Sequence, residues 1–335
     1  MASFRFNFLE TSKDNEEVTP ERECSTETNV ALSETSETKA AKRFHFVAVD
    51  TLWIEQALQN ETVEYDVLPF NDDGIEPLKI FRHSSSGIDS SLLNVETNQT
   101  DIVPGVYEGG LKVWECSIDL CNYLATHSDL LMPRYCLELG CGHALPACLI
   151  LRESLKKNFE SIVMFTDYND FVLKGVTIAN IALNTKTKNG VNPTDIIAKH
   201  AVLGYGDWID MSKQLCDSTH GISQLPLNGR FDLILAAETT YTTTSAQETA
   251  MLLARHLVPE TGVGLVATKR YYFGVGGGSD ALREAARKKL VVVNQLNYLV
   301  HIETVQVYED GTSNIRDLLK VTLRPAIGLS FLKEI

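Results

Sequence analysis

The spacing of apolar residues divides this chain into expected strands and helices. After a pair of glycines at 109–110, apolar positions recur every three or four residues, which predicts a helix over 113–126. Farther along, short apolar runs alternate with helical patterns. We expect strands over 134–139, 161–167, 199–203, 231–238 and 262–269, and helices that start near Pro146 or cover 170–184, 245–257 and 280–297.

This alternation of strands and helices is typical of an α/β domain. It predicts a mainly parallel, doubly wound sheet with helices on both faces. The segments 301–309 and 318–324 are expected to pair as a C-terminal antiparallel hairpin. Ligands of such sheets bind at the carboxyl ends of the strands, so we expect a site beside the strand at 134–139.

The N-terminal part of the chain differs in composition. Residues 1–42 are rich in acids, Ser and Thr, which predicts a disordered acidic arm. Its FRFNF segment fits an anchor for a sheet edge or another surface about as well as an accidental cluster. Residues 43–105 hold short alternating runs between polar turns, and we expect a small β-rich lead-in there. The main domain is expected over 106–335.

Composition narrows the class of protein. The chain has 335 residues, 44% of them hydrophobic, and no apolar run long enough for a membrane helix, so we expect a cytoplasmic and nuclear protein without a membrane partner. A net charge of −14 argues against direct DNA binding and suits a basic protein partner, although it also serves simple solubility. The seven cysteines, without a CxxC pair, predict reduced thiols and no metal site.

The segment LELGCGHALP, residues 137–146, indicates ligand chemistry. Its two glycines let backbone approach a ligand at a helix N-terminus, but a dinucleotide fingerprint needs a third glycine where Leu145 stands. Glu138 would repel a diphosphate and attract a cation. S-adenosylmethionine fits, because it carries a sulfonium and an ammonium and offers its carboxylate to the exposed N–H groups. We therefore expect it in preference to a generic nucleotide.

Two later loops add polar groups to the same edge. Asp167, at the end of the second strand, is placed to accept hydrogen bonds from ribose hydroxyls, or merely to cap the following helix. Gly206, Asp207 and Trp208 follow the third strand and can set a carboxylate and an aromatic face against adenine. The combination with the strand order, more than any single motif, favours a methyl donor.

These loops carry a family resemblance. ELGCG, TDYN and AAETTY, which follow the first, second and fourth strands, resemble the class I, seven-strand Rossmann-like methyltransferases. GGLKVWE (109–115), KRYYFGVGGG (269–278) and SFRFNF near the start resemble more narrowly the histidine protein methyltransferase family, which includes methyltransferase-like protein 18 in animals and a fungal counterpart. The resemblance makes 106–335 an S-adenosylmethionine-dependent methyltransferase domain.

The resemblance implies an activity, a partner and a set of contacts. The activity is methyl transfer to the τ nitrogen of one histidine in protein three of the large ribosomal subunit, and so a role in ribosome biogenesis and translation. We expect a monomer. The family's cofactor contacts, carried over by motif, fall on Trp114, Glu115, Cys116, Glu138, Gly140, Gly142, Asp167, Tyr168, Asn169, Gly206, Asp207, Trp208 and Ala237. Members commonly have serine where this chain has Ala237, which puts a hydroxyl contact there in doubt.

Glu238, at the end of the fourth strand, is the candidate catalytic residue. The τ nitrogen of an imidazole can attack only while the π nitrogen holds the proton, and Glu238 is a candidate acceptor for that N–H. A helix cap or a structural ion pair explains the position equally well. Tyr241, Tyr271, Tyr272 and Phe273 are candidate walls of the target pocket. Without the resemblance, the glycine-rich 274–278 would favour a flexible connector.

Two alternatives to histidine methylation remain open. Glu238-Thr239-Thr240-Tyr241 resembles the acid-x-x-Tyr element of related protein-lysine methyltransferases. The chain can also be a binding module that keeps the fold without turnover. Methylation of a nucleic-acid base is disfavoured, because the chain has neither an Asn/Asp-Pro-Pro-Tyr element nor a basic face.

Overall fold

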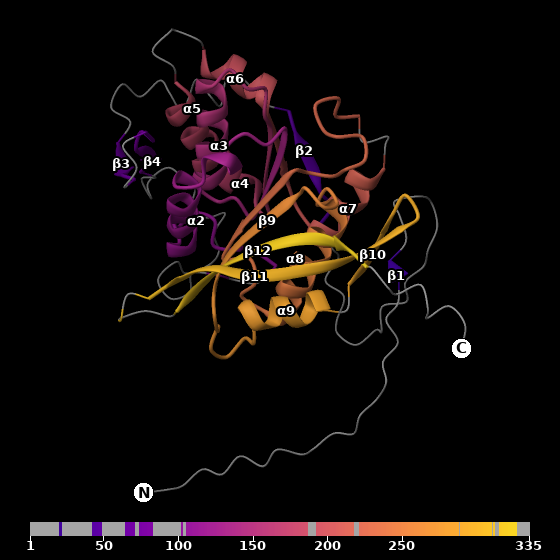
Figure 1. Ribbon diagram of the computed structural model, residues 1–335. Helices are drawn as coiled ribbons and strands as arrows, with labels where there is room; N and C mark the ends of the chain where they lie inside the picture. Colours follow the sequence, from indigo (N-terminus) through magenta and orange to yellow (C-terminus); the bar gives the residue numbers. More distant parts are fainter. Residues whose placement is uncertain are drawn as a thin grey trace, which may run out of the picture.

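A central sheet with helices on both faces forms the body of the molecule (Figure 1). The computed structural model describes residues 20–21, 42–48, 64–70, 74–82, 102, 105–186, 192–217, 221–287, 289–309, 311 and 315–326. The acidic arm lies outside these residues except for 20–21 and Lys42, and so does the FRFNF segment. The boundaries proposed at residues 42 and 105 stay predictions.

The parallel part of the sheet has the order β7-β6-β5-β8-β9. Because the chain first builds outward from β5 on one side and then returns to the other, β5 marks the point where the strand order reverses. The side chains of these five parallel strands are mostly buried, as expected where helices cover both faces of a sheet. The strands are β5 Tyr135–Leu139, β6 Ile162–Asp167, β7 Ala201–Tyr205, β8 Leu233–Ala237 and β9 Val263–Lys269.

Further strands extend both edges of the sheet. On one side β12 pairs antiparallel with β9, β11 pairs with β12, and β10 and β1 follow. On the other side β2 pairs antiparallel with β7. The predicted C-terminal antiparallel hairpin is confirmed. These strands are β1 Pro20–Glu21, β2 His45–Val47, β10 Leu290–Val293, β11 Leu296–Tyr308 and β12 Arg316–Pro325.

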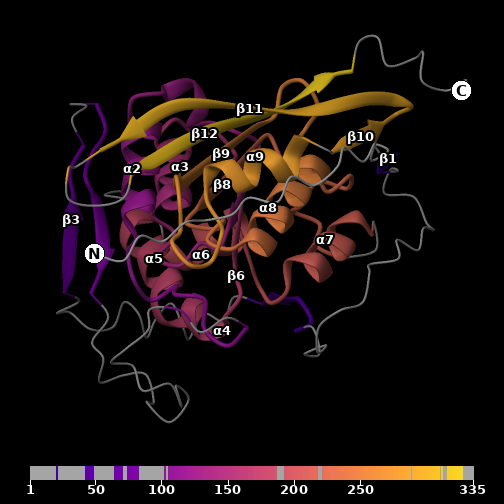
Figure 2. The ribbon, with the colours of Figure 1, turned by 90° about the horizontal axis from the view of Figure 1, so that it is seen from below.

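Two groups of helices cover the opposite faces of the sheet (Figure 2). One group consists of α2 Glu115–Ala125, α3 Leu145–Lys156, α4 Asp170–Val172, the π-turn η2 Leu173–Thr177, α5 Ile178–Thr185 and α6 Pro193–His200, with the short 3₁₀ turn η1 Ser128–Leu130 after α2. The other consists of α7 Trp208–Cys216, α8 Thr243–His256 and α9 Ser279–Arg287. The two faces bury separate apolar clusters, so the doubly wound architecture is confirmed.

The lead-in contributes a separate hairpin of β3 Tyr65–Leu68 and β4 Leu78–Phe81. Helix α5 holds it through amide side chains. Asn180 Oδ1 accepts a hydrogen bond from the Phe81 N–H at 2.7 Å, and Asn184 both accepts from and donates to the backbone of Lys79. These bonds replace the strand partner that the edge of β4 lacks on that side.

Two predicted elements were wrong in part. The helix expected over 280–297 ends at Arg287, because the following apolar, Val-rich run Leu290–Val293 forms β10. Asn294 and Gln295, both with positive φ, make the two-residue turn into β11. The third strand starts at Ala201 and not at residue 199, since α6 continues to His200.

Five cysteines are buried free thiols, as expected: Cys116, Cys121, Cys136, Cys141 and Cys148. Cys216, half-buried at the end of α7, departs from that expectation because it is disulfide-bonded. None of the helices in the described part of the chain has the length and apolar character that crossing a membrane requires.

Candidate active site

A cavity of about 790 Å³ opens at the carboxyl ends of the parallel strands. It lies beside β5, where the strand order reverses. Carboxylates outnumber lysines on its wall, whose charged residues are Glu108, Glu138, Asp167, Asp207, Glu238, Glu248, Lys42, Lys112 and Lys269. The charge of this wall favours a ligand that carries a positive charge.

The loop between β5 and α3 brings bare backbone to the cavity. Gly140 and Gly142 have φ values of +60° and +51°, which L side chains rarely adopt. A Cβ atom on Gly142 would lie 3.0 Å from the carbonyl oxygen of Gly110. The loop around Gly110 therefore packs directly on the glycine loop, and both need small residues there.

Asp167 ties this loop to the end of β6. Its Oδ2 accepts a hydrogen bond from the Gly142 N–H at 3.0 Å, and its Oδ1 accepts one from the Asn169 N–H at 3.0 Å. Burial nevertheless raises the pKa of Asp167 to about 6. Each oxygen keeps acceptor capacity for a ligand hydroxyl.

Glu138 is the second buried carboxylate of this loop. Its Oε2 accepts a hydrogen bond from the Ala147 N–H in the first turn of α3 at 3.2 Å. Burial raises the pKa of Glu138 well above its usual value; the bond from Ala147 opposes this and nearby Asp167 reinforces it. A cation in the cavity would stabilise the ionised form of both carboxylates.

Asp207, Trp208 and Tyr168 line the adjoining wall. Asp207 begins α7 and accepts a hydrogen bond from the Asp210 N–H at 3.0 Å, so one of its oxygens is a helix cap. Lys42 donates to the carbonyl oxygen of Tyr168 at 2.9 Å and lies 4.8 Å from the centre of its ring. This wall combines a carboxylate with aromatic faces, as the sequence predicts for an adenine site.

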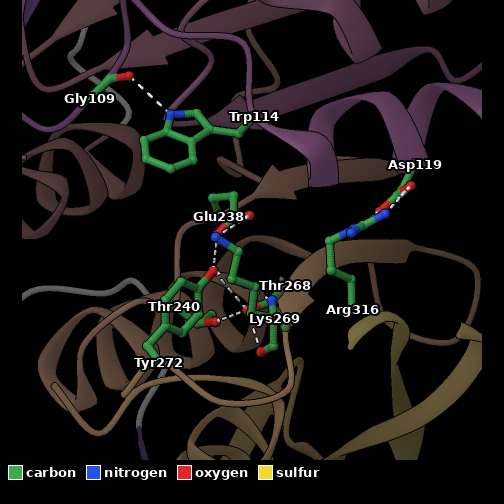
Figure 3. A network of polar contacts seen from close by, with 9 residues as sticks. All are labelled: Gly109, Trp114, Asp119, Glu238, Thr240, Thr268, Lys269, Tyr272 and Arg316. Carbon is green, nitrogen blue, oxygen red and sulfur yellow. Dashed lines mark hydrogen bonds and ion pairs between the residues drawn. The ribbon is translucent and has the colours of Figure 1, made fainter. Parts of the chain in front are cut away.

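Glu238 lies at the far end of β8 with an unusual backbone. Its φ is +58°, which costs a non-glycine residue about 1 kcal/mol or more, and its side chain is only 7% exposed. The Tyr272 hydroxyl donates a hydrogen bond to Oε2, while Oε1 lies 3.8 Å from Lys269 Nζ and has no hydrogen-bond partner among the described residues (Figure 3). Such strain is typical of residues whose position is functional.

The structure answers one alternative for Glu238. Helix α8 is capped by Thr242 and Ser245, whose side chains and backbone N–H groups bond reciprocally. Glu238 is therefore not the cap of the next helix. The ion pair with Lys269 is present, but at 3.8 Å it leaves Oε1, the oxygen that faces Lys269, without a hydrogen bond among the described residues.

The glycine-rich segment 274–278 fixes Tyr272 beside Glu238. A Cβ atom on Gly277 would lie 2.1 Å from the Thr240 carbonyl oxygen, and the Gly278 N–H donates to that oxygen at 2.8 Å. Backbone thus packs on backbone where the loop passes the end of β8. Gly274, Gly276 and Gly278 have positive φ, and another segment of backbone approaches Gly277 and Gly278 closely, so glycine is required along this loop.

Trp114 contacts both the loop at Gly109 and Lys269, the lysine that pairs with Glu238. Its indole N–H donates to the carbonyl oxygen of Gly109 at 3.0 Å (Figure 3). Lys112 Nζ lies 4.6 Å from the centre of the Trp114 ring, and Lys269 Nζ lies 5.5 Å from it. The ring therefore lies near two lysines that have different surroundings: the side chain of Lys269 is 18% exposed, while Lys112 is an exposed residue.

Comparison with known proteins gives curated relatives that are similar to most of this chain. The chain is 36% identical over 225 residues to a histidine protein methyltransferase 1 homolog of Dictyostelium discoideum, which is 67% of this chain and 61% of that protein. It is 33% identical over 235 residues to histidine protein methyltransferase 1 of Schizosaccharomyces pombe, 63% of this chain and 66% of that protein. The chain belongs to the histidine protein methyltransferase 1 family. It spans about three fifths to two thirds of the length of these curated relatives.

Solved structures are more distantly similar. A class I S-adenosylmethionine-dependent methyltransferase of Listeria monocytogenes is 11% identical, with a TM-score of 0.41 over 71% of this chain and 67% of that chain. Precorrin-6y C5,15-methyltransferase of Geobacter metallireducens is 15% identical, with a TM-score of 0.34 over 61% of this chain and 87% of that chain. No protein-family model matches the sequence.

Most residues that the family motifs predict meet at the cavity. Its wall includes Trp114, Glu138, Gly140, Gly142, Asp167, Tyr168, Asp207, Trp208, Ala237, Glu238, Tyr241 and Tyr272. They come from the carboxyl ends of five different strands, from the loops that follow these strands, and from the segment before α2. The motifs of the histidine protein methyltransferase 1 family are thus far apart in the sequence and adjacent in the fold.

Six predicted residues do not line the cavity: Glu115, Cys116, Asn169, Gly206, Tyr271 and Phe273. Glu115, Tyr271 and Phe273 are exposed. Asn169 acts one step away, because its side chain bonds the backbone of Val106 and Glu108 and holds the loop over the site. Gly206 is needed for a different reason, since a Cβ there would lie 2.4 Å from the Arg43 carbonyl oxygen.

Several wall residues were not predicted. Glu108 accepts a hydrogen bond from the Tyr241 hydroxyl. Burial raises the pKa of Glu248 in α8 to about 7, helped by Asp207 and Glu108. Glu248 sits in an ordinary amphipathic helix, which gave no signal. Lys112 and Lys269 stand within the GGLKVWE and KRYYFGVGGG motifs, so the resemblance marked their segments without assigning them a role.

Proposed function

We propose that this chain transfers a methyl group from S-adenosylmethionine to the τ nitrogen of a histidine in a basic protein of the large ribosomal subunit. The observation that carries the proposal is the environment of the Glu238 carboxylate. One of its oxygens is buried and without a hydrogen bond among the described residues, beside a cavity rich in carboxylates. A buried acceptor of this kind suits an N–H donor from a ligand.

The donor end fits S-adenosylmethionine in charge and in backbone. Bound there, this cofactor supplies a methyl group on an electrophilic sulfonium. Glu138 and Asp167 suit its positive charge, and the exposed backbone at Gly140 and Gly142 suits its carboxylate. Asp167 is available to ribose hydroxyls, and Asp207 with Trp208 to adenine.

The acceptor end suits an imidazole. With a pKa near 6.5, an unperturbed histidine is mostly neutral at pH 7, so the protein must orient it more than deprotonate it. Glu238 Oε1 accepts the π N–H and so leaves the lone pair on the τ nitrogen. With the donor bound, the new N–C bond would form as the C–S bond breaks and S-adenosylhomocysteine leaves. Glu238 would then take the π proton of the methylated imidazolium and pass it to solvent.

The proposed substrate follows from the family motifs and from charge. The chain carries a net charge of −14, and the cavity adds a carboxylate-rich opening. A basic ribosomal protein is complementary to both. The role in ribosome biogenesis and translation, in cytoplasm and nucleus, is part of the same proposal.

The test is transfer of label from tritiated S-adenosylmethionine to large-subunit ribosomal proteins from a strain that lacks this protein. We expect label in one protein, recovered as τ-methylhistidine and located by mass spectrometry. Label recovered as methyllysine would support the lysine alternative. Donor binding in calorimetry with no label in any basic protein would support the binding module.

A further inference from the structure

We infer that Lys269 is a specificity-determining residue, which excludes lysine side chains from the acceptor site and leaves it to a neutral imidazole. The inference rests on the proposed function and names the feature that separates histidine from lysine as acceptor. Neither the sequence motifs nor the electrostatics of the donor end assign a role to Lys269.

The ammonium group of Lys269 occupies the place where the ammonium of a substrate lysine would bind. Nζ lies 3.8 Å from Glu238 Oε1, the oxygen proposed to meet the acceptor. It also lies 5.5 Å from the centre of the Trp114 ring and 5.6 Å from that of Tyr272. A carboxylate flanked by aromatic rings is the surrounding that a substrate ammonium would need. In this chain its own lysine already occupies it.

The backbone holds Lys269 there from two sides. Lys269 is the last residue of β9, and its neighbour Thr268 is buried and hydrogen-bonded to Thr240 at 2.6 Å. On the other side the Arg270 guanidinium pairs with Asp317 of β12 at 2.6 Å. Both neighbours are anchored, so the Lys269 side chain starts from a fixed point below Trp114 (Figure 3).

Charge then separates the two acceptors. A lysine has to enter as an ammonium and lose a proton before it can attack, so it needs a carboxylate for both steps. Lys269 neutralises that carboxylate and repels a second cation a few ångströms away. A neutral imidazole feels no such repulsion, and its π N–H needs only the one lone pair of Oε1.

Few groups in the described part of the chain face the ion pair of Lys269 and Glu238. Glu238, Trp114 and Tyr272 lie around Lys269. Cys116 is buried beside Glu238, and Lys112 lies over the same Trp114 ring. Burial and nearby Glu238 raise the pKa of Tyr272, so its hydroxyl stays protonated and donates to Glu238. Among the described residues, Glu238 is the one carboxylate paired with Lys269.

The first test measures binding of small probes to the full chain loaded with S-adenosylhomocysteine. At pH 8 free imidazole is mostly neutral and n-butylamine is a cation. Saturation-transfer NMR is expected to give a signal from imidazole and little from n-butylammonium with the wild type. The variant Lys269→Met is expected to raise the n-butylammonium signal about fivefold or more, since the site gains a free carboxylate.

The second test measures the products. Wild type and Lys269→Met act on large-subunit ribosomal proteins from the strain that lacks this protein, and the hydrolysate is analysed for τ-methylhistidine and methyllysine. We expect the ratio of methyllysine to τ-methylhistidine to rise at least about tenfold in Lys269→Met. An unchanged ratio would overturn the inference.

Two further variants separate charge from mere structure. Lys269→Arg keeps the positive charge, so it is expected to restore a low ratio even where its rate is lower. Lys112→Met removes a cation from the same cavity wall and the same Trp114 ring but not from Glu238, so its ratio should match the wild type. A rise in Lys112→Met equal to that in Lys269→Met would overturn the inference, because it would show an effect of net charge alone.

The outcomes distinguish this inference from the proposed function. If the wild type makes τ-methylhistidine and the ratio does not change in Lys269→Met, the function stands and the inference fails. If the wild type binds no imidazole and makes no τ-methylhistidine, both fail.

Discussion

The two ends of the cavity hold their carboxylates in different ways. At the donor end, Glu138 and Asp167 accept hydrogen bonds from backbone N–H groups, those of Ala147, Gly142 and Asn169. At the acceptor end, Glu238 is held by side chains, the Tyr272 hydroxyl and the Lys269 ammonium. Two of the three donor-end bonds join residues two and nine apart in the sequence and the third, from Gly142 to Asp167, spans 25, whereas the acceptor-end contacts of Glu238 span 31 and 34 residues.

This difference determines what each end can do. Backbone donors are fixed in place and have no positive charge to offset that of a buried carboxylate. Burial therefore raises the pKa values of Asp167 and Glu138 at the donor end. Side-chain donors can carry charge, as Lys269 does, and can differ between proteins, so the acceptor end can choose a substrate. We expect changes at the donor end to alter affinity, and changes at the acceptor end to alter turnover and choice of acceptor.

The largest expected effect is at Glu238. Glu238→Gln keeps the size of the side chain but turns one oxygen into an N–H₂ group, which cannot accept the π N–H of an imidazole. We expect methylation by donor-saturated enzyme to fall about 100-fold, while the dissociation constant for S-adenosylmethionine changes by less than about threefold. Single-turnover rates and calorimetry measure the two quantities separately.

The matched variant is Glu138→Gln at the donor end, which should show the opposite split. Its amide oxygen can still accept from Ala147, but the negative charge is lost, so donor affinity is expected to fall while turnover at saturation falls less. If Glu238→Gln instead abolishes donor binding and leaves saturated turnover unchanged, the division of the cavity into two ends is wrong.

A smaller effect is expected from the donor loop. Gly142→Ala places a Cβ 3.0 Å from the Gly110 carbonyl oxygen at a φ of +51°. Both the strain and the contact push the two loops apart, so we expect donor affinity to fall about tenfold, with a loss of stability of about 1 kcal/mol. Calorimetry and thermal unfolding check the two values.

Gly274→Ala is the control for backbone strain alone. Gly274 has a φ of +85° and nothing within 4 Å of a Cβ position. It should lose a similar amount of stability and keep the donor affinity of the wild type. Equal losses of affinity in both variants would mean that the contact with Gly110 is irrelevant to the donor site.

The same contrast explains how much the sequence could reveal. The donor end was predictable because its two carboxylates stand within the short motifs ELGCG and TDYN, beside the glycines and the strand ends that form the site. The parallel strands were predictable as apolar runs. At the acceptor end, the pairing of Lys269 with Glu238 depends on the neighbouring positions of β8 and β9, which no local pattern encodes.

The errors in the fold have a local cause. Apolar residues in 280–287 recur with helical spacing, and the pattern shows no end of the helix before Leu290. The hairpin that follows was not recognised either, because its turn residues Asn294 and Gln295 lack the glycine that is usual in such a turn. Helices α6 and α7 were missed because both are short and follow polar segments. In α7 the cap residue Asp207 was read only as a ligand contact, and it is both.

The smallest expected effect is the pH dependence of donor binding. The pKa of Asp167 in the free protein is raised to about 6, chiefly by burial. Hydrogen bonds from a ribose, or a nearby cation, favour the ionised carboxylate, so the bound pKa is lower. The free protein then holds a proton near pH 6 that the complex does not, and binding releases it. Affinity therefore rises with pH through about 6 and flattens above about 7.

Between pH 7 and pH 5.5 we expect the affinity for S-adenosylmethionine to fall about fourfold from Asp167 alone. The donor's amino group stays protonated in this range, so it does not contribute. Calorimetry in two buffers of different ionisation enthalpy, on a variant with both Glu248→Gln and Glu138→Gln to remove the two neighbouring titrations, should find about half a proton released at pH 6. S-adenosylhomocysteine, which lacks the sulfonium, divides the cause: an equal dependence assigns it to ribose hydrogen bonds, and a weaker one to charge. A flat profile for both ligands would remove Asp167 from the donor site and leave only the acceptor end of the comparison.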